Sequence, residues 1–153
     1  RDHVSAVTGY PTKRLYIDRE AVGYGVEITE TPNMLDKVLK DKRYKVGADC
    51  ARPETISYLA NLGYNIHGAK KWQGSVEDGI EFLKGFEKIV IHPSCVHTIQ
   101  EFTRYGYKID KHTNEILPIV VDAYNHCIDA SRYALDDMIK KKTTIYDAGV
   151  MYG

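Results

Sequence analysis

Hydrophobic and polar residues alternate along this chain in two rhythms, one typical of strands and one typical of helices. Runs rich in β-branched and aromatic residues predict strands at residues 4–10, 14–20, 43–49, 64–69 and 89–92. Between and after them, apolar residues recur every three or four positions and predict helices at residues 31–40, 53–62, 75–86, 94–103 and 123–140. Strands that alternate with helices in this way predict one α/β domain, a mixed sheet flanked by helices.

Turn signals refine the connections between these elements. Pro11-Thr12-Lys13 separates the first two strands and predicts an antiparallel hairpin, whereas strand 43–49, helix 53–62 and strand 64–69 predict a parallel βαβ unit. The polar run 110–115 between two β-rich runs predicts an extra β-hairpin that projects from the sheet. Ser75 followed by Asp78 resembles a capping box at the start of a helix.

Composition bounds the organisation and the partners. A chain of 153 residues with 43% hydrophobic and 27% charged residues suits a single soluble domain, residues 1–153. Lys plus Arg and Asp plus Glu both number 21, so contact with nucleic acid would need a local basic patch. Three widely spaced cysteines fit neither disulfides nor a zinc site, and predict buried, reduced thiols of an intracellular protein. No signal peptide or membrane span is visible, and Arg1 in place of Met indicates a fragment of a longer protein.

Asp49 is the first candidate for catalysis, because it ends strand 43–49. Ligands of α/β sheets bind outside the carboxyl ends of the strands, so a carboxylate at this position is available for chemistry. The same residue could instead cap the helix that begins near Pro53. This stretch alone leaves both interpretations open.

A second group of candidates shares one face of the last predicted helix. Asp122, His126, Asp129 and Tyr133 are spaced at i, i+4, i+7 and i+11. If this face packs beside the strand ends, Asp129 and Asp49 can share a divalent cation, and carboxylate oxygens select Mg²⁺ or Mn²⁺. Two such metals could hydrolyse a phosphodiester. The alternatives are a solvent-facing acid for Asp129 and a partly buried structural histidine for His126.

Three ordered segments carry a resemblance to a known family. Residues 47–56, 70–80 and 125–134, supported by 15–20 and 92–110, resemble the nuclease domain of tailed-phage terminase large subunits. The resemblance implies an RNase H-like fold and a Mg²⁺- or Mn²⁺-dependent endonuclease. Such an enzyme cuts concatemeric double-stranded DNA with little sequence specificity while phage genomes are packaged in the cytoplasm of the bacterial host. Implied partners are the DNA, the phage portal, the small terminase subunit and an upstream ATPase domain of the same protein.

The resemblance also assigns residues. Asp49 matches the second catalytic acid of the family, Asp129 the third, and His126 a histidine beside the metal site. The first acid lies in a Gly-x-Asp-x-Gly segment on the first, central strand, and the sequence contains no such segment. We expect that strand to precede Arg1, which would leave residues 1–153 catalytically incomplete. Asp2 is not expected to replace the missing acid, and Asp18, on a neighbouring strand, is a weaker substitute for it. No P-loop occurs, so no nucleotide is expected to bind this domain.

Basic residues near the strand ends are the candidates for DNA binding. Lys70, Lys71 and Arg52 would contact phosphates, with Lys108 and Lys111 on the hairpin as a possible arm; their alternative is a set of ordinary surface cations. Trp72 is expected to pack on the sheet edge rather than stack on bases. Two other functions remain open: a non-catalytic module whose hairpin, residues 105–120, docks DNA or a portal, and an RNase H-like nuclease of the resolvase or integrase type.

Overall fold

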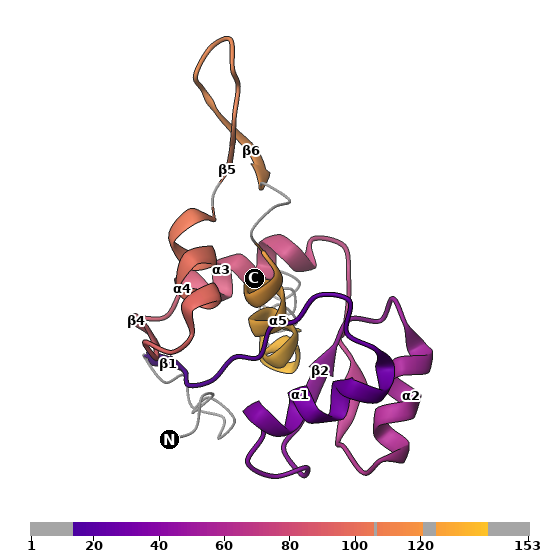
Figure 1. The fold of residues 1–153 in the computed structure, drawn as a ribbon. Helices are drawn as coiled ribbons and strands as arrows, with labels where there is room; N and C mark the ends of the chain where they lie inside the picture. Colours follow the sequence, from indigo (N-terminus) through magenta and orange to yellow (C-terminus); the bar gives the residue numbers. More distant parts are fainter. Residues whose placement is uncertain (1–13, 106, 121–124, 141–153) are drawn as a thin grey trace, which may run out of the picture.

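The computed structural model describes residues 14–105, 107–120 and 125–140 (Figure 1). Its strands are β1 (Arg14–Ile17), β2 (Val46–Ala48), β3 (Ile66–Gly68), β4 (Lys88–Ile91), β5 (Tyr107–Ile109) and β6 (Ile116–Val120). Its helices are the short 3₁₀ helix η2 (Ile28–Glu30), α1 (Thr31–Val38), α2 (Pro53–Asn61), α3 (Ser75–Lys84), α4 (Val96–Arg104) and α5 (His126–Ala134). The predicted strand 4–10 and its hairpin with β1 lie outside the described residues.

The described strands form three pairs. β2 and β3 pair in parallel, with Val46 opposite Ile66, which confirms the predicted βαβ unit around α2. β1 pairs in parallel with β4, which is distant in the sequence, and Leu15 lies opposite Ile89. β5 and β6 pair antiparallel, as predicted for the second hairpin, and Figure 1 shows this hairpin projecting from the body of the molecule.

Helix α5 lies at the centre of the molecule and contacts β2, α3 and α4 (Figure 1). Its contact with β2 depends on Gly47, because a Cβ atom at that position would lie 2.4 Å from the backbone oxygen of Tyr133. The strand therefore lies directly against the backbone of the helix. This close approach brings the residue that follows β2, Asp49, beside the carboxyl-terminal half of α5.

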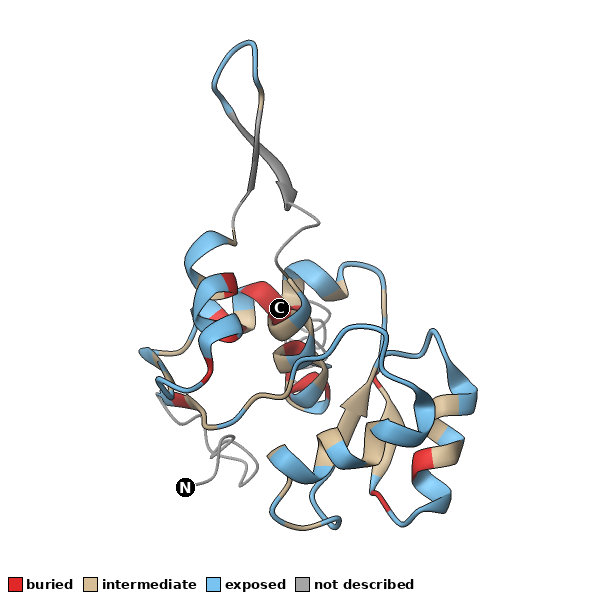
Figure 2. Cartoon of the chain, in the orientation of Figure 1, coloured by how far each residue is buried: buried red, intermediate tan, exposed pale blue. Residues whose placement is uncertain are grey.

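An apolar cluster among the described residues joins elements around α5. Figure 2 shows buried residues on α3, α4 and the α5 region, among neighbours of intermediate burial and exposed residues. Each buried aliphatic side chain contributes about 1.5–3 kcal/mol to folding. The cluster consists of Leu15, Ile80, Leu83, Ile128, Leu135 and Ile139. It joins β1 to α3 and α5.

The sequence predicted one continuous helix over residues 123–140, and this prediction is wrong. α5 ends at Ala134, a turn follows at Leu135, and the chain is helical again over 136–140. At this turn the carboxylate of Asp136 accepts hydrogen bonds from the backbone N–H groups of Lys70, at 2.8 Å, and of Asp137, at 2.7 Å. Aspartate side chains that bind backbone N–H groups compete with the helical ladder, which explains the interruption.

The start of α3 also differs from the prediction. Gly74, with φ of 82°, occupies the N-cap position without a side-chain cap, so the capping box of Ser75 and Asp78 does not form. Asp78 instead accepts a hydrogen bond from the indole nitrogen of Trp72 at 2.7 Å. Trp72 packs against the apolar cluster, which confirms its predicted role in packing.

The cysteines follow the prediction only in part. Cys95 is buried and Cys127 half-buried, but Cys50 is exposed, so the prediction of three buried thiols is wrong for Cys50. The reason is its position: it follows Asp49 in the turn that leads from β2 to α2. Among the described residues no helix is long and apolar enough to cross a bilayer.

Candidate functional site

Asp49 lies at the carboxyl end of β2 and faces a lysine. Its carboxylate is half-exposed and accepts a hydrogen bond from Nζ of Lys71 at 2.6 Å. This hydrogen bond lowers the pKa of Asp49 and raises the pKa of Lys71, so both groups are charged at neutral pH. Arg52 occupies the N-cap position of α2, where no side chain caps the helix. The interpretation of Asp49 as a helix cap is therefore wrong.

Asp129 lies on α5 and pairs with an arginine of the same helix. Nη2 of Arg132 donates to the carboxylate of Asp129 at 2.7 Å, and the side chain of Arg132 is only 8% exposed. The stem of Arg132 fills the space that Gly79 leaves on α3, because a Cβ at Gly79 would lie 2.5 Å from Cδ of Arg132. Asp129 is thus held by a cation that is itself fixed between two helices.

Tyr133 lies between the two ion pairs. Nζ of Lys71 is 5.7 Å from the centre of its ring, and Cζ of Arg132 is 5.4 Å from it. Burial raises the pKa of Tyr133, and the negative charges of Asp129 and Asp49 raise it further. The ion pairs of Asp49 and Asp129, the two acids that the sequence predicted as partners, thus both lie beside the ring of Tyr133.

The other predicted residues are distributed around this centre. His126 is the first residue of α5, is exposed, and precedes Asp129 by one turn. Nζ of Lys70 pairs with Asp137 at 2.6 Å rather than with Asp49, and Arg52 is exposed at the start of α2. Of the three cations proposed for DNA, only Lys71 contacts a predicted catalytic acid. Asp122 and the side chain of Lys108 lie outside the described residues.

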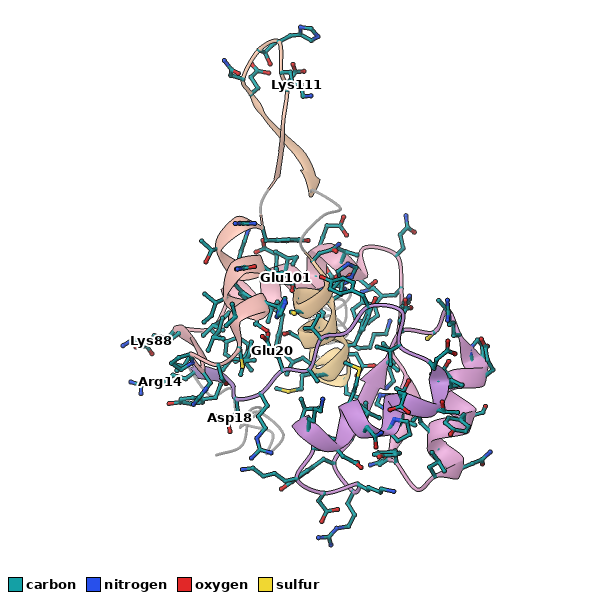
Figure 3. The ribbon with its side chains drawn as sticks, viewed as in Figure 1. Arg14, Asp18, Glu20, Lys88, Glu101 and Lys111 are labelled. Atoms are coloured by element: carbon teal, nitrogen blue, oxygen red, sulfur yellow. The ribbon has the colours of Figure 1, made fainter. Side chains whose placement is uncertain are left out.

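The hairpin arm is remote from these acids. Figure 3 shows Lys111 at the far end of the hairpin, where residues 111–115 are all exposed. Figure 3 also shows Asp18 just after β1, on the side of the molecule away from the hairpin. Within the ranges 14–105, 107–120 and 125–140, neither Asp18 nor any other His, Cys, Asp or Glu joins a group of three that could hold a metal.

The donor chemistry of Asp49 and Asp129 nevertheless suits a hard divalent cation. Both residues offer carboxylate oxygens, the ligands that Mg²⁺ and Mn²⁺ prefer. An ammonium group already neutralises Asp49 from 2.6 Å, which shows that this carboxylate is accessible to a cation. Asp49 and Asp129 are therefore the candidate ligands for such a cation among the described residues.

Sequence reasoning missed Arg132 and the role of Asp136. Arg132 follows Asp129 by three residues, a spacing that places two side chains on the same helix face and could have indicated the pair. Asp136 gave no such signal, because its partner, the backbone of Lys70, is 66 residues away.

Comparison with known proteins identifies relatives of one kind. A family model described as "Terminase RNAseH like domain" matches residues 5–137. The chain is 37% identical over 131 residues to the large terminase subunit of Bacillus phage SPP1, which covers 84% of this chain and 31% of that protein. It is 32% identical over 95 residues to the PBSX phage terminase large subunit of Bacillus subtilis (strain 168), covering 60% of this chain and 21% of that protein. The chain thus spans about a third or less of these relatives.

A solved structure agrees with these matches. The nuclease domain of g2p, the large terminase of bacteriophage SPP1, crystallised with bound Mn, superimposes with a TM-score of 0.70 and 34% sequence identity. The match covers 82% of this chain and 72% of that chain. It confirms the predicted RNase H-like fold and favours the terminase resemblance over a nuclease of the resolvase or integrase type.

Proposed function

The chain belongs to the family of terminase RNase H-like domains, and from this premise we propose that it is an endonuclease domain that cuts double-stranded DNA with the help of Mg²⁺ or Mn²⁺. The observation that carries the proposal is geometric: the ion pair of Asp49 with Lys71, at the end of β2, and that of Asp129 with Arg132, on α5, both lie beside the ring of Tyr133, with Nζ of Lys71 5.7 Å and Cζ of Arg132 5.4 Å from its centre. Hydrolysis of a phosphodiester by bound metals needs carboxylates from different elements at one place.

The residues of this chain have distinct parts in the proposed reaction. Asp49 and Asp129 would hold a divalent cation, which, when bound, activates water and stabilises the leaving oxygen; we propose a site of two such metals. His126, on the same helix as Asp129, would contact the phosphate or orient that carboxylate. Two carboxylates are few for Mg²⁺, so we propose that a further acid, in the position of the family's first one, completes the site.

DNA binding would rest on charge. Lys71 lies at Asp49, near the proposed metal position, and Lys70 directly precedes it in the chain. Arg52 lies at the start of α2. Contacts from such residues to phosphate oxygens carry no base information, which agrees with cutting of little sequence specificity. By its family, we further propose concatemeric phage DNA as substrate in the host cytoplasm, and the portal, the small terminase subunit and an ATPase domain of the same protein as partners.

Plasmid cleavage by the full-length protein tests the proposal. Supercoiled plasmid with Mn²⁺ should be cut by the wild type, and Asp49→Asn or Asp129→Asn should reduce the rate by about a hundredfold or more, because each removes a charged ligand. Asp137→Asn is the matched control: this exposed acid also pairs with lysines, Lys45 and Lys70, but not at the proposed metal position.

Circular dichroism and thermal melting would show that each variant is folded. Cutting at the wild-type rate by either Asp49→Asn or Asp129→Asn would refute the assignment of that acid. Absence of cutting by the wild type with every divalent cation tried, together with tight DNA binding, would favour a non-catalytic docking module instead.

A further inference from the structure

The two proposed metal-binding acids are neutralised by cations of different kinds. Asp49 pairs with Lys71 on the surface, where the side chains are 52% and 50% exposed. Asp129 pairs with Arg132, whose side chain is 8% exposed. Both contacts are short, 2.6 and 2.7 Å, so the difference between them lies in what surrounds each cation.

Arg132 is fixed by its neighbours. Its aliphatic stem lies against Gly79 of α3, its Nη1 lies 3.5 Å from the backbone oxygen of Ser75, and its guanidinium lies near the ring of Tyr133. Its buried Nε has no hydrogen-bond partner among the residues that the structure describes. Burial of a guanidinium with an unsatisfied donor costs free energy, and removal of Arg132 from Asp129 would require α3 and α5 to repack.

Lys71 shares only the contact with the ring of Tyr133, at 5.7 Å, and its side chain is 50% exposed. It lies in the segment between β3, which ends at Gly68, and α3, which begins at Ser75, and its ammonium group is carried by a flexible four-carbon stem. An exposed ion pair of this kind is weak, because water solvates both partners and the lysine loses side-chain freedom. A divalent cation bound by Asp49 would repel the ammonium group at its present distance.

We propose that Lys71 is a displaceable counter-ion, which neutralises Asp49 until a divalent cation binds and then leaves it, whereas Arg132 is a positioning residue that holds Asp129 in both states. This inference rests on the proposed metal-dependent function. The displaced ammonium group stays beside the metal position and becomes available to a DNA phosphate. Metal binding and DNA contact are thereby coupled through one side chain.

Calorimetric titration of the full-length protein with Mn²⁺ tests the displacement. The part of the Mn²⁺-binding heat that is lost in Asp49→Asn is assigned to this site. Lys71→Met removes the competing cation and should tighten Mn²⁺ binding there by about two- to fivefold, the range expected for an exposed ion pair. Lys71→Arg keeps the charge and should bind Mn²⁺ within about twofold of the wild type. Lys45→Met is the matched control, since Lys45 directly precedes β2 but pairs with Asp137.

The outcomes separate the inference from the function on which it rests. Equal or weaker Mn²⁺ binding by Lys71→Met, or an equal gain in Lys45→Met, overturns the displacement but leaves the metal site standing. Absence of Mn²⁺ binding by both the wild type and Lys71→Met overturns the proposed function and the inference together. A crystal structure with Mn²⁺ should retain the pair of Arg132 with Asp129 and lack that of Lys71 with Asp49; persistence of the latter overturns the proposal.

Discussion

At the scale of single residues, Glu20 shows how one carboxylate can organise a distant helix. It accepts hydrogen bonds from the backbone N–H groups of His97, at 3.0 Å, and Thr98, at 2.9 Å, and from the hydroxyl of Thr98 at 2.7 Å. Burial alone would raise the pKa of Glu20, but these hydrogen bonds outweigh it and lower the pKa below the ordinary value of 4.5. Glu20 therefore does for α4 what a local N-cap residue does in most helices.

This cap predicts a pH-dependent loss of stability. Glu20→Gln should lower the free energy of unfolding by about 1–2 kcal/mol at pH 7, because the amide is a weaker acceptor than the carboxylate. Since the pKa is lowered in the folded state, the stabilisation is complete above about pH 4.5 and disappears as the pH falls through the lower, folded-state pKa. Urea unfolding of the wild type and of Glu20→Gln at several pH values measures this stabilisation.

Wild type and Glu20→Gln should therefore converge in stability at acid pH. The exposed Glu27 supplies the control Glu27→Gln, which should differ little from the wild type at any pH. A Glu20→Gln penalty that stays constant down to about pH 3 would contradict the assignment of the cap.

At the scale of elements, the contact of β2 with α5 sets where Asp49 lies relative to the helix that carries Asp129. A Cβ at Gly47 would collide with the backbone oxygen of Tyr133, and backbone cannot move aside as a flexible side chain can. Gly47→Ala should therefore lower the free energy of unfolding by about 1–3 kcal/mol and, because Asp49 follows two residues later, weaken Mn²⁺ binding as well.

Denaturant unfolding and calorimetry would measure the two effects of Gly47→Ala. Gly85→Ala makes the same chemical change at the end of α3, where the added Cβ would lie 3.2 Å from the oxygen of Phe82. It should have a smaller effect on stability and none on Mn²⁺ binding. Full Mn²⁺ affinity in Gly47→Ala would show that the close approach of β2 and α5 is not needed for the site.

At the scale of the whole molecule, the β5–β6 hairpin stands apart from the body that carries the acids (Figure 1). Its exposed tip, residues 111–115, can contact a ligand without disturbing the core. Lys111→Glu should therefore weaken binding of duplex DNA a few-fold. The slope of the logarithm of affinity against the logarithm of salt concentration should fall by the amount expected for about one phosphate contact, and the melting temperature of the protein should not change.

Fluorescence anisotropy at several salt concentrations measures the effect of Lys111→Glu. Lys88→Glu is the control, because Lys88 is exposed at the start of β4, away from the hairpin (Figure 3). Equal losses of affinity in both variants would indicate a general effect of charge and argue against an arm. A loss confined to Lys111→Glu would support the hairpin as a contact with DNA.

The sequence by itself determined what depends on neighbouring residues. Side-chain periodicity and turn residues are local properties, and they predicted the helices, the βαβ unit of β2 and β3, the second hairpin and the position of Asp49 after a strand. The spacing of His126, Asp129 and Tyr133 likewise placed them on one helix. The three ordered segments predicted the terminase family, which the comparisons confirmed.

Only the tertiary structure decided what depends on residues distant in sequence. Lys71 meets Asp49 across 22 residues and Asp136 meets the backbone of Lys70 across 66, and neither partner can be read from local pattern. For the same reason the pairing of β1 with β4 and the break at Leu135 were not predicted. The sequence named Asp49 and Asp129 as partners, but the packing of Gly47 against the backbone of α5, a contact without a side-chain signature, sets how β2 lies against the helix that carries Asp129.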